Sequence, residues 1–194
     1  YEIGSGLVGS EMCIRDSKGL YGPQGTGILL CDHEVIPLLE GGTGSLSARQ
    51  EMPDFLPDRL EAGTHNMPGI AGLLAGVRFV RQLGPEAICA GERQLTFQAA
   101  EGLRRLPGLQ VFALPDLAAQ AGVLSIVPER MDAEALGAAL ADRGIAVRAG
   151  LHCAPLAHRT AGTLDTGTVR LSFSHWNTRE EVSRFLVAMG EILR

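Results

Sequence analysis

The sequence lacks the features that would place it in a membrane, on nucleic acid or in an oxidising compartment. No apolar run approaches the roughly 20 residues that cross a bilayer, and the net charge of −5 comes with no basic patch suited to nucleic acid. The four cysteines are scattered without a CxxC pair, and no secretory signal is recognisable. We therefore expect a cytoplasmic protein with reduced thiols and no membrane or nucleic-acid partner.

The first 17 residues lack any regular pattern. Tyr1 to Ser17 has neither helical nor strand periodicity, and it lacks the charged region and apolar core of a signal peptide. The segment resembles translated library-adaptor sequence of the kind found at the ends of metagenomic reading frames. We interpret it as such an artefact, with a flexible native terminus as the alternative. On this interpretation, residues 1–17 pack poorly and Lys18 is the first genuine residue.

The remaining sequence has the composition of a globular protein, with 45% hydrophobic residues among 194. The pattern predicts two units that divide at Gly84-Pro85, one at 18–84 and a compact α+β unit at 85–194. The expected strands lie at 25–31, 109–114, 122–127, 145–148 and 168–173, and the expected helices at 68–83, 86–106 and 132–142, with a last helix that begins after Thr178. Asp132 and the Thr178–Glu181 pair are predicted helix caps, and 40–65 and 151–167 are predicted loops.

A lysine precedes the first Gly-rich turn, in the sequence KGLYGPQGTG at 18–27. A lysine that forms an imine must be partly desolvated, and the floor of a pocket beside a buried strand would provide this. Taken alone the signal is weak, because most lysines next to loops are solvated. It is not a Walker A loop, since no Lys-Ser or Lys-Thr pair follows the glycines.

Two further Gly-rich motifs, EGGTGS at 40–45 and EAGT at 61–64, could hold a phosphate. Glycines expose backbone N–H groups, and the neighbouring hydroxyls add donors. Each motif by itself is equally compatible with simple turn chemistry.

A cysteine follows a predicted strand in the sequence RAGLHCAPLAHR at 148–159. Flanked by Arg148 and His152, Cys153 could be a reactive and exposed thiol. The alternatives are an inert buried cysteine or a metal site formed with His152 and His158, but three ligands without a fourth make a poor structural zinc site. We expect no metal.

An arginine lies between apolar residues in the predicted strand TVRLSF at 168–173. Such a charge must be paired or must point into a polar cleft, where Arg170 could grip a carboxylate with two hydrogen bonds. The alternative is a strand with one solvated face.

Together, the order and spacing of these motifs from Lys18 to Arg194 resemble the cysteine desulfurase and selenocysteine lyase branch of the class V aminotransferases, in the subgroup with an EGG motif. The resemblance implies an α/β fold of the type I pyridoxal-phosphate-dependent transferases. The chain would comprise the C-terminal part of the large cofactor domain, with a connecting helix, and the small C-terminal domain.

The resemblance also implies roles for individual residues. Lys18 would bind pyridoxal phosphate as an imine, and Gly63 and Thr64 would reach the cofactor phosphate of the neighbouring subunit of a homodimer, near the Gly41-Gly42 turn. Arg170, helped by Arg148, would bind the carboxylate of an amino acid substrate. Cys153 would accept sulfur as a persulfide and could pass it to an acceptor protein.

Two departures from the family pattern qualify this prediction. Ser17 occupies the position of a family histidine, and the aromatic and acidic residues that contact the cofactor ring have no counterpart in this sequence. We therefore expect the chain itself to be inactive. The alternatives to cysteine desulfuration are transamination, selenocysteine lysis, a Cys–His hydrolase or a non-catalytic interaction module.

Overall fold

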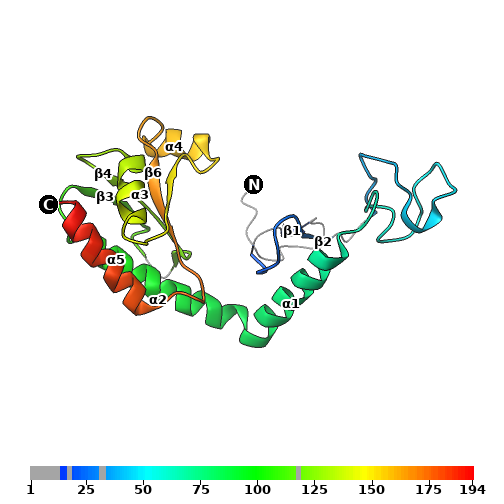
Figure 1. Cartoon of the computed structure of the whole chain (residues 1–194), viewed down its shortest axis with the longest axis horizontal. Helices are drawn as coiled ribbons and strands as arrows, with labels where there is room; N and C mark the ends of the chain where they lie inside the picture. Colours follow the sequence, from blue (N-terminus) through cyan, green and yellow to red (C-terminus); the bar gives the residue numbers. More distant parts are fainter. Residues whose placement is uncertain (1–13, 17–18, 31–33, 117–118) are drawn as a thin grey trace. The chain divides into compact units, whose positions relative to one another are not determined.

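The computed structural model describes residues 14–16, 19–30, 34–116 and 119–194 (Figure 1). The chain divides into two compact units, Tyr1–Leu83 and Gly84–Arg194. This division lies next to the Gly84-Pro85 position that the sequence indicates. Among the described residues, no helix combines the length and apolar character needed to cross a membrane.

The first unit contains little regular structure before its single long helix. Strand β1 (Ile14–Asp16) pairs antiparallel with β2 (Ile28–Leu30), and a short 3-10 helix, η1 (Gly44–Leu46), lies within the Gly-rich loops. Helix α1 spans Met67–Leu83, as its apolar spacing predicts. Except for β1, the segment 1–17 lies outside the described residues, and its origin stays a prediction.

Small residues bring the chain segment after Lys18 against α1. A Cβ atom at Gly76 would meet the carbonyl oxygen of Leu20, and one at Gly22 would meet the side chain of Leu73. Tyr21 also contacts Phe79 edge to face, with ring centroids 5.5 Å apart. The Gly-rich turn is therefore held on the helix by close backbone packing.

The second unit is a four-stranded antiparallel sheet in the order β3-β4-β6-β5. Its strands are β3 (Leu109–Phe112), β4 (Val123–Pro128), β5 (Arg148–Gly150) and β6 (Thr168–Ser172), and its helices are α2 (Pro85–Leu103), α3 (Ala133–Ala141), α4 (Pro155–Ala161) and α5 (Arg179–Ile192). Helices α2 and α5 pack against each other, as Figure 1 shows, and α3 packs on the sheet and on α5.

Alternation along the strands separates an apolar face from a polar face. Leu124 and Ile126 of β4 and Val169 and Leu171 of β6 are buried in the core formed with α2, α3 and α5. Each fully buried Leu or Ile contributes about 1.5–3 kcal/mol to stability. Ser125 and Arg170, which lie directly opposite each other, belong to the other face of the sheet.

The predicted helix caps are confirmed. The Asp132 carboxylate accepts a 2.6 Å hydrogen bond from the backbone N–H of Ala135 at the start of α3. At the start of α5, Thr178 and Glu181 form both arms of a capping box, with hydrogen bonds of 3.2 and 2.9 Å.

Three sequence predictions are wrong. The strand expected to be buried at 25–31 is β2, in which Leu29 and Leu30 are about half exposed. The strand expected at 145–148 lies at Arg148–Gly150, because Ile145 and Val147 pack against the core while pairing with β6 begins at Thr168 opposite Gly150. The loop expected at 151–167 contains α4, which has Pro155 in its first turn and ends at Gly162 in a left-handed conformation. The buried residue of α4 is His158, so the helix has no periodic apolar pattern from which the sequence could predict it.

Candidate functional site

The polar face of the sheet brings together three predicted site residues. Arg148 of β5 lies directly opposite Arg170 of β6 in the antiparallel register, so both side chains start from the same face, with Cβ atoms roughly 5 Å apart. Nη2 of Arg148 lies 3.9 Å from Sγ of Cys153, within reach of a hydrogen bond to sulfur. A thiol and two guanidinium groups thus gather at the end of β5.

The chain follows a strained path at this thiol. His152 and Cys153 have φ angles of +52° and +60°, a left-handed region that non-glycine residues seldom adopt. Gly150 (φ +106°) and Gly167 (φ +61°) permit the close backbone approach beside them, since a Cβ at Gly167 would lie 3.1 Å from the Cα of Gly150. The outcome of this path is an exposed Cys153 side chain. Strain of this kind is common at functional sites.

His152 belongs to the loop 151–154 that carries Cys153, here called the thiol loop, and bonds to the sheet. Its Nε2 is 3.0 Å from Oγ1 of Thr168, a buried residue at the start of β6. Burial lowers the pKa of His152, and the charge of Arg170, then of His158, lowers it further. The imidazole is therefore neutral near pH 7, and its hydrogen bond goes to Thr168.

Two polar atoms next to this bond are buried without a protein partner among the described residues. They are Nδ1 of His152 and Nε of Arg170. Unpaired buried polar atoms cost stability and are uncommon in native proteins. Their presence on the polar face points to a ligand or water at this position.

His158 of α4 forms a separate bond. Its Nδ1 lies 2.8 Å from Oγ1 of Thr163, and its ring centroid is 5.7 Å from that of His152. Within the described part of the chain, no cluster of three or more potential ligands could hold a metal ion.

In the first unit, the two Gly-rich motifs meet. The backbone N–H groups of Gly44 and Gly63 both donate to the carbonyl oxygen of Gly42, at 2.7 and 2.8 Å. A Cβ at Gly42 would lie 2.7 Å from the Cα of Gly63, so only glycine fits there. Together with their neighbours, these residues line an open pocket: Gly41, Gly42, Thr43, Gly44, Ser47, Arg49, Gln50, Gly63 and Thr64.

This pocket is suited to an anion through its side chains. The N–H groups of Gly44 and Gly63 are already used within the loop. The Thr64 hydroxyl and the Arg49 guanidinium, which line the pocket, are suited to an anion. Asp58 stabilises the loop from behind. The hydroxyl and the backbone N–H of Ser45 donate to its carboxylate, and these bonds lower the pKa of Asp58.

Lys18 lies outside the described residues, so its predicted role stays a prediction. Lys18 is also the only lysine in the 194-residue sequence, a feature that its motif alone does not show. Two further residues were missed. Neither Thr168 nor Arg49 gives a functional signal in the sequence, because the role of each depends on a contact that only the fold provides.

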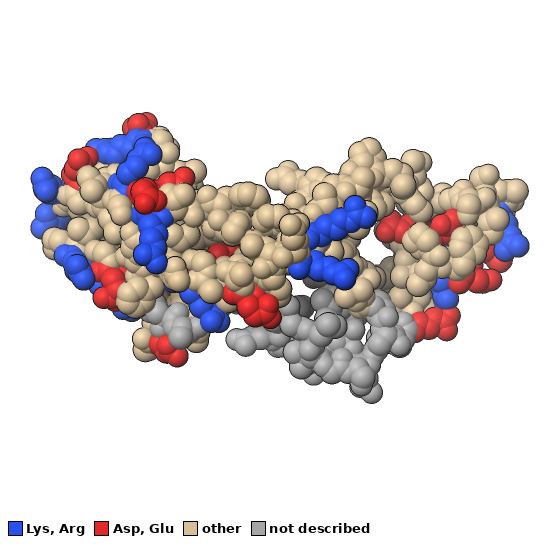
Figure 2. All heavy atoms as spheres, turned by 90° about the horizontal axis from the view of Figure 1, so that it is seen from below, with Lys and Arg blue, Asp and Glu red and all other residues tan. Residues whose placement is uncertain are grey.

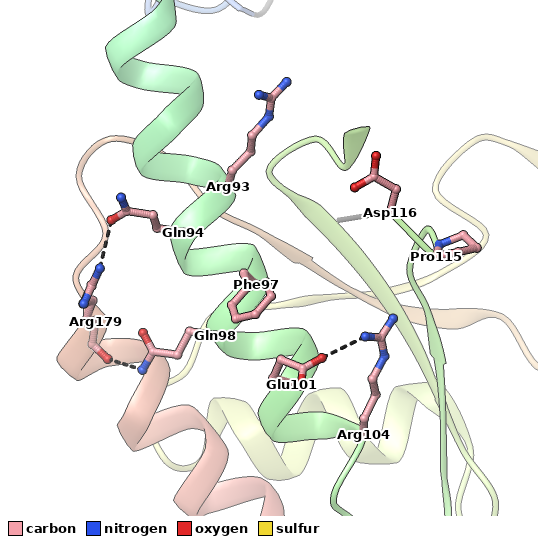
Figure 3. Close-up of a pocket in the computed structure, with 9 residues that line it drawn as sticks. All are labelled: Arg93, Gln94, Phe97, Gln98, Glu101, Arg104, Pro115, Asp116 and Arg179. Carbon is pink, nitrogen blue, oxygen red and sulfur yellow. Dashed lines mark hydrogen bonds and ion pairs between the residues drawn. The ribbon is translucent and has the colours of Figure 1, made fainter. Parts of the chain in front are cut away.

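Another hollow, along the exposed side of α2, lies among different residues. Figure 3 shows the Phe97 ring in it, with Arg179 bonded to Gln94 and Arg104 paired with Glu101. The residues that line it are Arg93, Gln94, Phe97, Gln98, Glu101, Arg104, Pro115, Asp116 and Arg179. None of these lining residues is a nucleophile like Cys153. On the face of the chain shown in Figure 2, basic and acidic side chains are interspersed.

The comparisons with known proteins agree with the motifs. The aminotransferase class-V family model matches residues 12–185. The probable cysteine desulfurase 2 of Mycobacterium leprae is 33% identical over 188 residues, which are 94% of this chain and 44% of that protein. The chain thus spans less than half the length of this relative.

Solved structures show the same fold. The cysteine desulfurase of Thermococcus onnurineus NA1 is 35% identical with a TM-score of 0.81, over 91% of this chain and 45% of that one. The cysteine desulfurase CsdA of Escherichia coli is 30% identical with a TM-score of 0.78, over 90% and 44%. The expected α/β fold of the type I pyridoxal-phosphate-dependent transferases is confirmed, and the chain belongs to the aminotransferase class-V family.

Proposed function

We propose that the protein to which this chain belongs is a pyridoxal-phosphate-dependent cysteine desulfurase. It would transfer the sulfur of L-cysteine to Cys153, which becomes a persulfide, and release alanine. The observation that carries the proposal is the gathering of an exposed thiol with Arg148 and Arg170 on one polar sheet face. The names of the relatives support the same activity.

The two arginines suit different tasks at this site. Arg170 is half-buried with an unpaired Nε, which is the state expected of a guanidinium that binds a substrate carboxylate. Arg148 is more exposed and contacts Sγ of Cys153, where its charge stabilises a thiolate during attack on sulfur. Arg148 could also help to bind the carboxylate.

The residues of the first unit fit the phosphate end of the cofactor. Gly41, Gly42, Gly63 and Thr64 would surround it, and Lys18 would hold the cofactor covalently. Bound pyridoxal phosphate would supply an electron sink for the amino acid substrate. Thr64 would serve the site of the neighbouring subunit, in a homodimer.

The wider organisation follows from the same proposal. Residues 18–84 would belong to the large cofactor domain and residues 85–194 would form the small domain. Exposed apolar side chains beside the EGG motif, at Ile36, Leu38 and Leu39, are of the kind found at protein interfaces. An acceptor protein would then take sulfur from the exposed Cys153.

The test is alanine release from L-cysteine by the full-length protein supplied with pyridoxal phosphate, together with sulfide release when an added thiol reduces the Cys153 persulfide and is itself oxidised to a disulfide. Cys153→Ala should abolish turnover yet keep cofactor absorbance. Cys89→Ala, which changes a half-buried thiol on α2, should leave both turnover and absorbance unchanged. Equal turnover of Cys153→Ala and wild type would contradict the proposal. Preference for selenocysteine, or transfer of the amino group instead of sulfur, would favour the related activities of the family.

Cofactor attachment has an equally direct test. In the full-length protein, borohydride should trap the cofactor on the ε-amino group of Lys18, and peptide mass mapping should locate the adduct at that residue. Lys18→Arg keeps the charge but cannot form an imine, so it should lose the trapped adduct. Retention of a reducible adduct in Lys18→Arg would contradict the assignment.

A further inference from the structure

We propose that His152 is a positioning residue, which fixes Cys153 beside Arg148 by its hydrogen bond to Thr168. The inference rests on the proposed function because it takes Cys153 as the reacting thiol. It concerns a residue that touches neither substrate nor cofactor in that proposal.

The first reason is that the thiol loop requires an anchor. Two consecutive residues in the left-handed region, His152 and Cys153, are unfavourable unless surrounding contacts impose that conformation. One contact lies within the loop, where the N–H of Ala154 donates to the carbonyl of Leu151 at 2.9 Å. The 3.0 Å bond between His152 and Thr168 connects the loop to the sheet.

The second reason is the place of that connection. Thr168 is buried and lies opposite Gly150 on β5, two residues before Arg170 on the same strand face. Arg148, which contacts Sγ of Cys153, lies opposite Arg170 in the register of β5 and β6. The bond therefore ties the thiol loop to β6, the strand that carries Arg170 and pairs with the strand that carries Arg148.

The third reason is the electrostatic setting. His152 is surrounded by Arg170 on β6, Arg148 on β5 and His158 on α4. A neutral ring keeps the contact between Nε2 and Thr168 without adding charge, whereas a second proton on the ring would add a like charge to this positive region.

The test measures the reactivity of Cys153 in the 194-residue chain, without substrate or cofactor. Alkylation by iodoacetamide at pH 7 is followed by peptide mass mapping, with half-buried Cys89 as an internal reference. His152→Ala should slow alkylation of Cys153 about three- to tenfold, the range that loss of one hydrogen bond gives. Thr168→Val should slow it similarly, and the double variant should be no slower than either single variant.

Two conservative variants separate positioning from backbone strain. Glutamine can place an amide near the position of Nε2, so His152→Gln should restore most of the rate. Asparagine tolerates the left-handed region better but is too short to reach Thr168, so His152→Asn should remain slow. If asparagine restores the rate and glutamine does not, backbone preference governs the loop and the inference is wrong.

The neighbouring pair supplies the matched control. Thr163→Val removes the same kind of bond, to His158 on α4, and should leave alkylation of Cys153 unchanged. An equal loss in Thr163→Val would reveal general loosening and overturn the inference, as would an unchanged rate in His152→Ala. If the alkylation results hold but the full-length protein releases no sulfide, the proposed function fails while the positioning role stands.

Discussion

At the scale of single residues, the thiol site concentrates features that a stable fold would otherwise avoid. His152 and Cys153 occupy left-handed backbone conformations, and Nδ1 of His152 and Nε of Arg170 are buried without protein partners among the described residues. Each of these costs free energy, and all occur within one turn and its facing strand. Their concentration at the thiol indicates that the site is built for a ligand, because structural stability alone would select against them.

Arg170 provides the first prediction at this scale. In the full-length protein, Arg170→Ala should reduce kcat/KM for cysteine about ten- to a hundredfold, the effect of losing a charged hydrogen bond worth about 1.5–3 kcal/mol. Steady-state kinetics with cysteine provide the measurement. Arg143→Ala, which removes an arginine that follows α3 and bonds to a carbonyl of that helix, is the control. Equal effects of the two substitutions would contradict the role of Arg170.

His152 provides a second prediction, on pH. Because burial and the nearby positive charges lower its folded-state pKa, the unfolded chain takes up this proton more readily than the folded chain does. The free energy of unfolding should therefore fall as the pH drops below the ordinary histidine pKa of about 6.5. In His152→Gln, which cannot bind the proton, the loss between pH 7.5 and 5.5 should be smaller. Urea denaturation at both pH values measures this, and identical losses would refute it.

At the scale of elements, helix ends stabilise the second unit. Thr178 and Glu181 cap α5, the amphipathic helix that places Val182, Phe185 and Met189 in the core. Thr178→Ala should lower the free energy of unfolding by about 1 kcal/mol, since it removes an N-cap hydrogen bond. Thr160→Ala, which removes an exposed hydroxyl bond within α4, is the matched control for chemical denaturation. A larger loss in Thr160→Ala would contradict this account of the cap.

Elements with strong local signals could be predicted from the sequence, and those fixed by tertiary pairing could not. Helix α1 and the Thr178 cap follow from apolar spacing and capping residues that are visible in the chain. Strand β5 could not be located, because Ile145 and Val147 look like strand residues yet pack against the core outside the sheet. Helix α4 has only seven residues and one buried side chain, too little for a periodic pattern.

The candidate site divides in the same way. Cys153, Arg148 and Arg170 could be singled out from residue type and motif order, whereas the facing register of Arg148 and Arg170 required the sheet. Thr168 was missed because a threonine in a strand carries no functional signal until its partner is known. The convergence of the two Gly-rich motifs also depends on long-range contact, through Gly42 and Gly63.

At the scale of the whole molecule, the two units differ in how they are stabilised. Within the part of the chain that the structure describes, the buried apolar cluster lies entirely between Leu95 and Met189, in the second unit. In the first unit, large apolar side chains such as Ile36, Leu38 and Leu39 are between 79% and 100% exposed. The second unit therefore has a core of its own, while the first unit presents apolar surface that a further protein segment or subunit could cover.

This difference predicts that residues 84–194 fold by themselves. The separate segment should unfold in one cooperative urea transition, and Cys153 should react with iodoacetamide at the rate found in the 194-residue chain, because its anchor Thr168 and its neighbour Arg148 lie within the segment. The complementary segment 1–83 should bind a hydrophobic dye and show no such transition. Circular dichroism with denaturant and thiol mapping provide the measurements. A segment 84–194 without cooperative unfolding, or with an altered thiol rate, would show that the first unit contributes to the fold around Cys153.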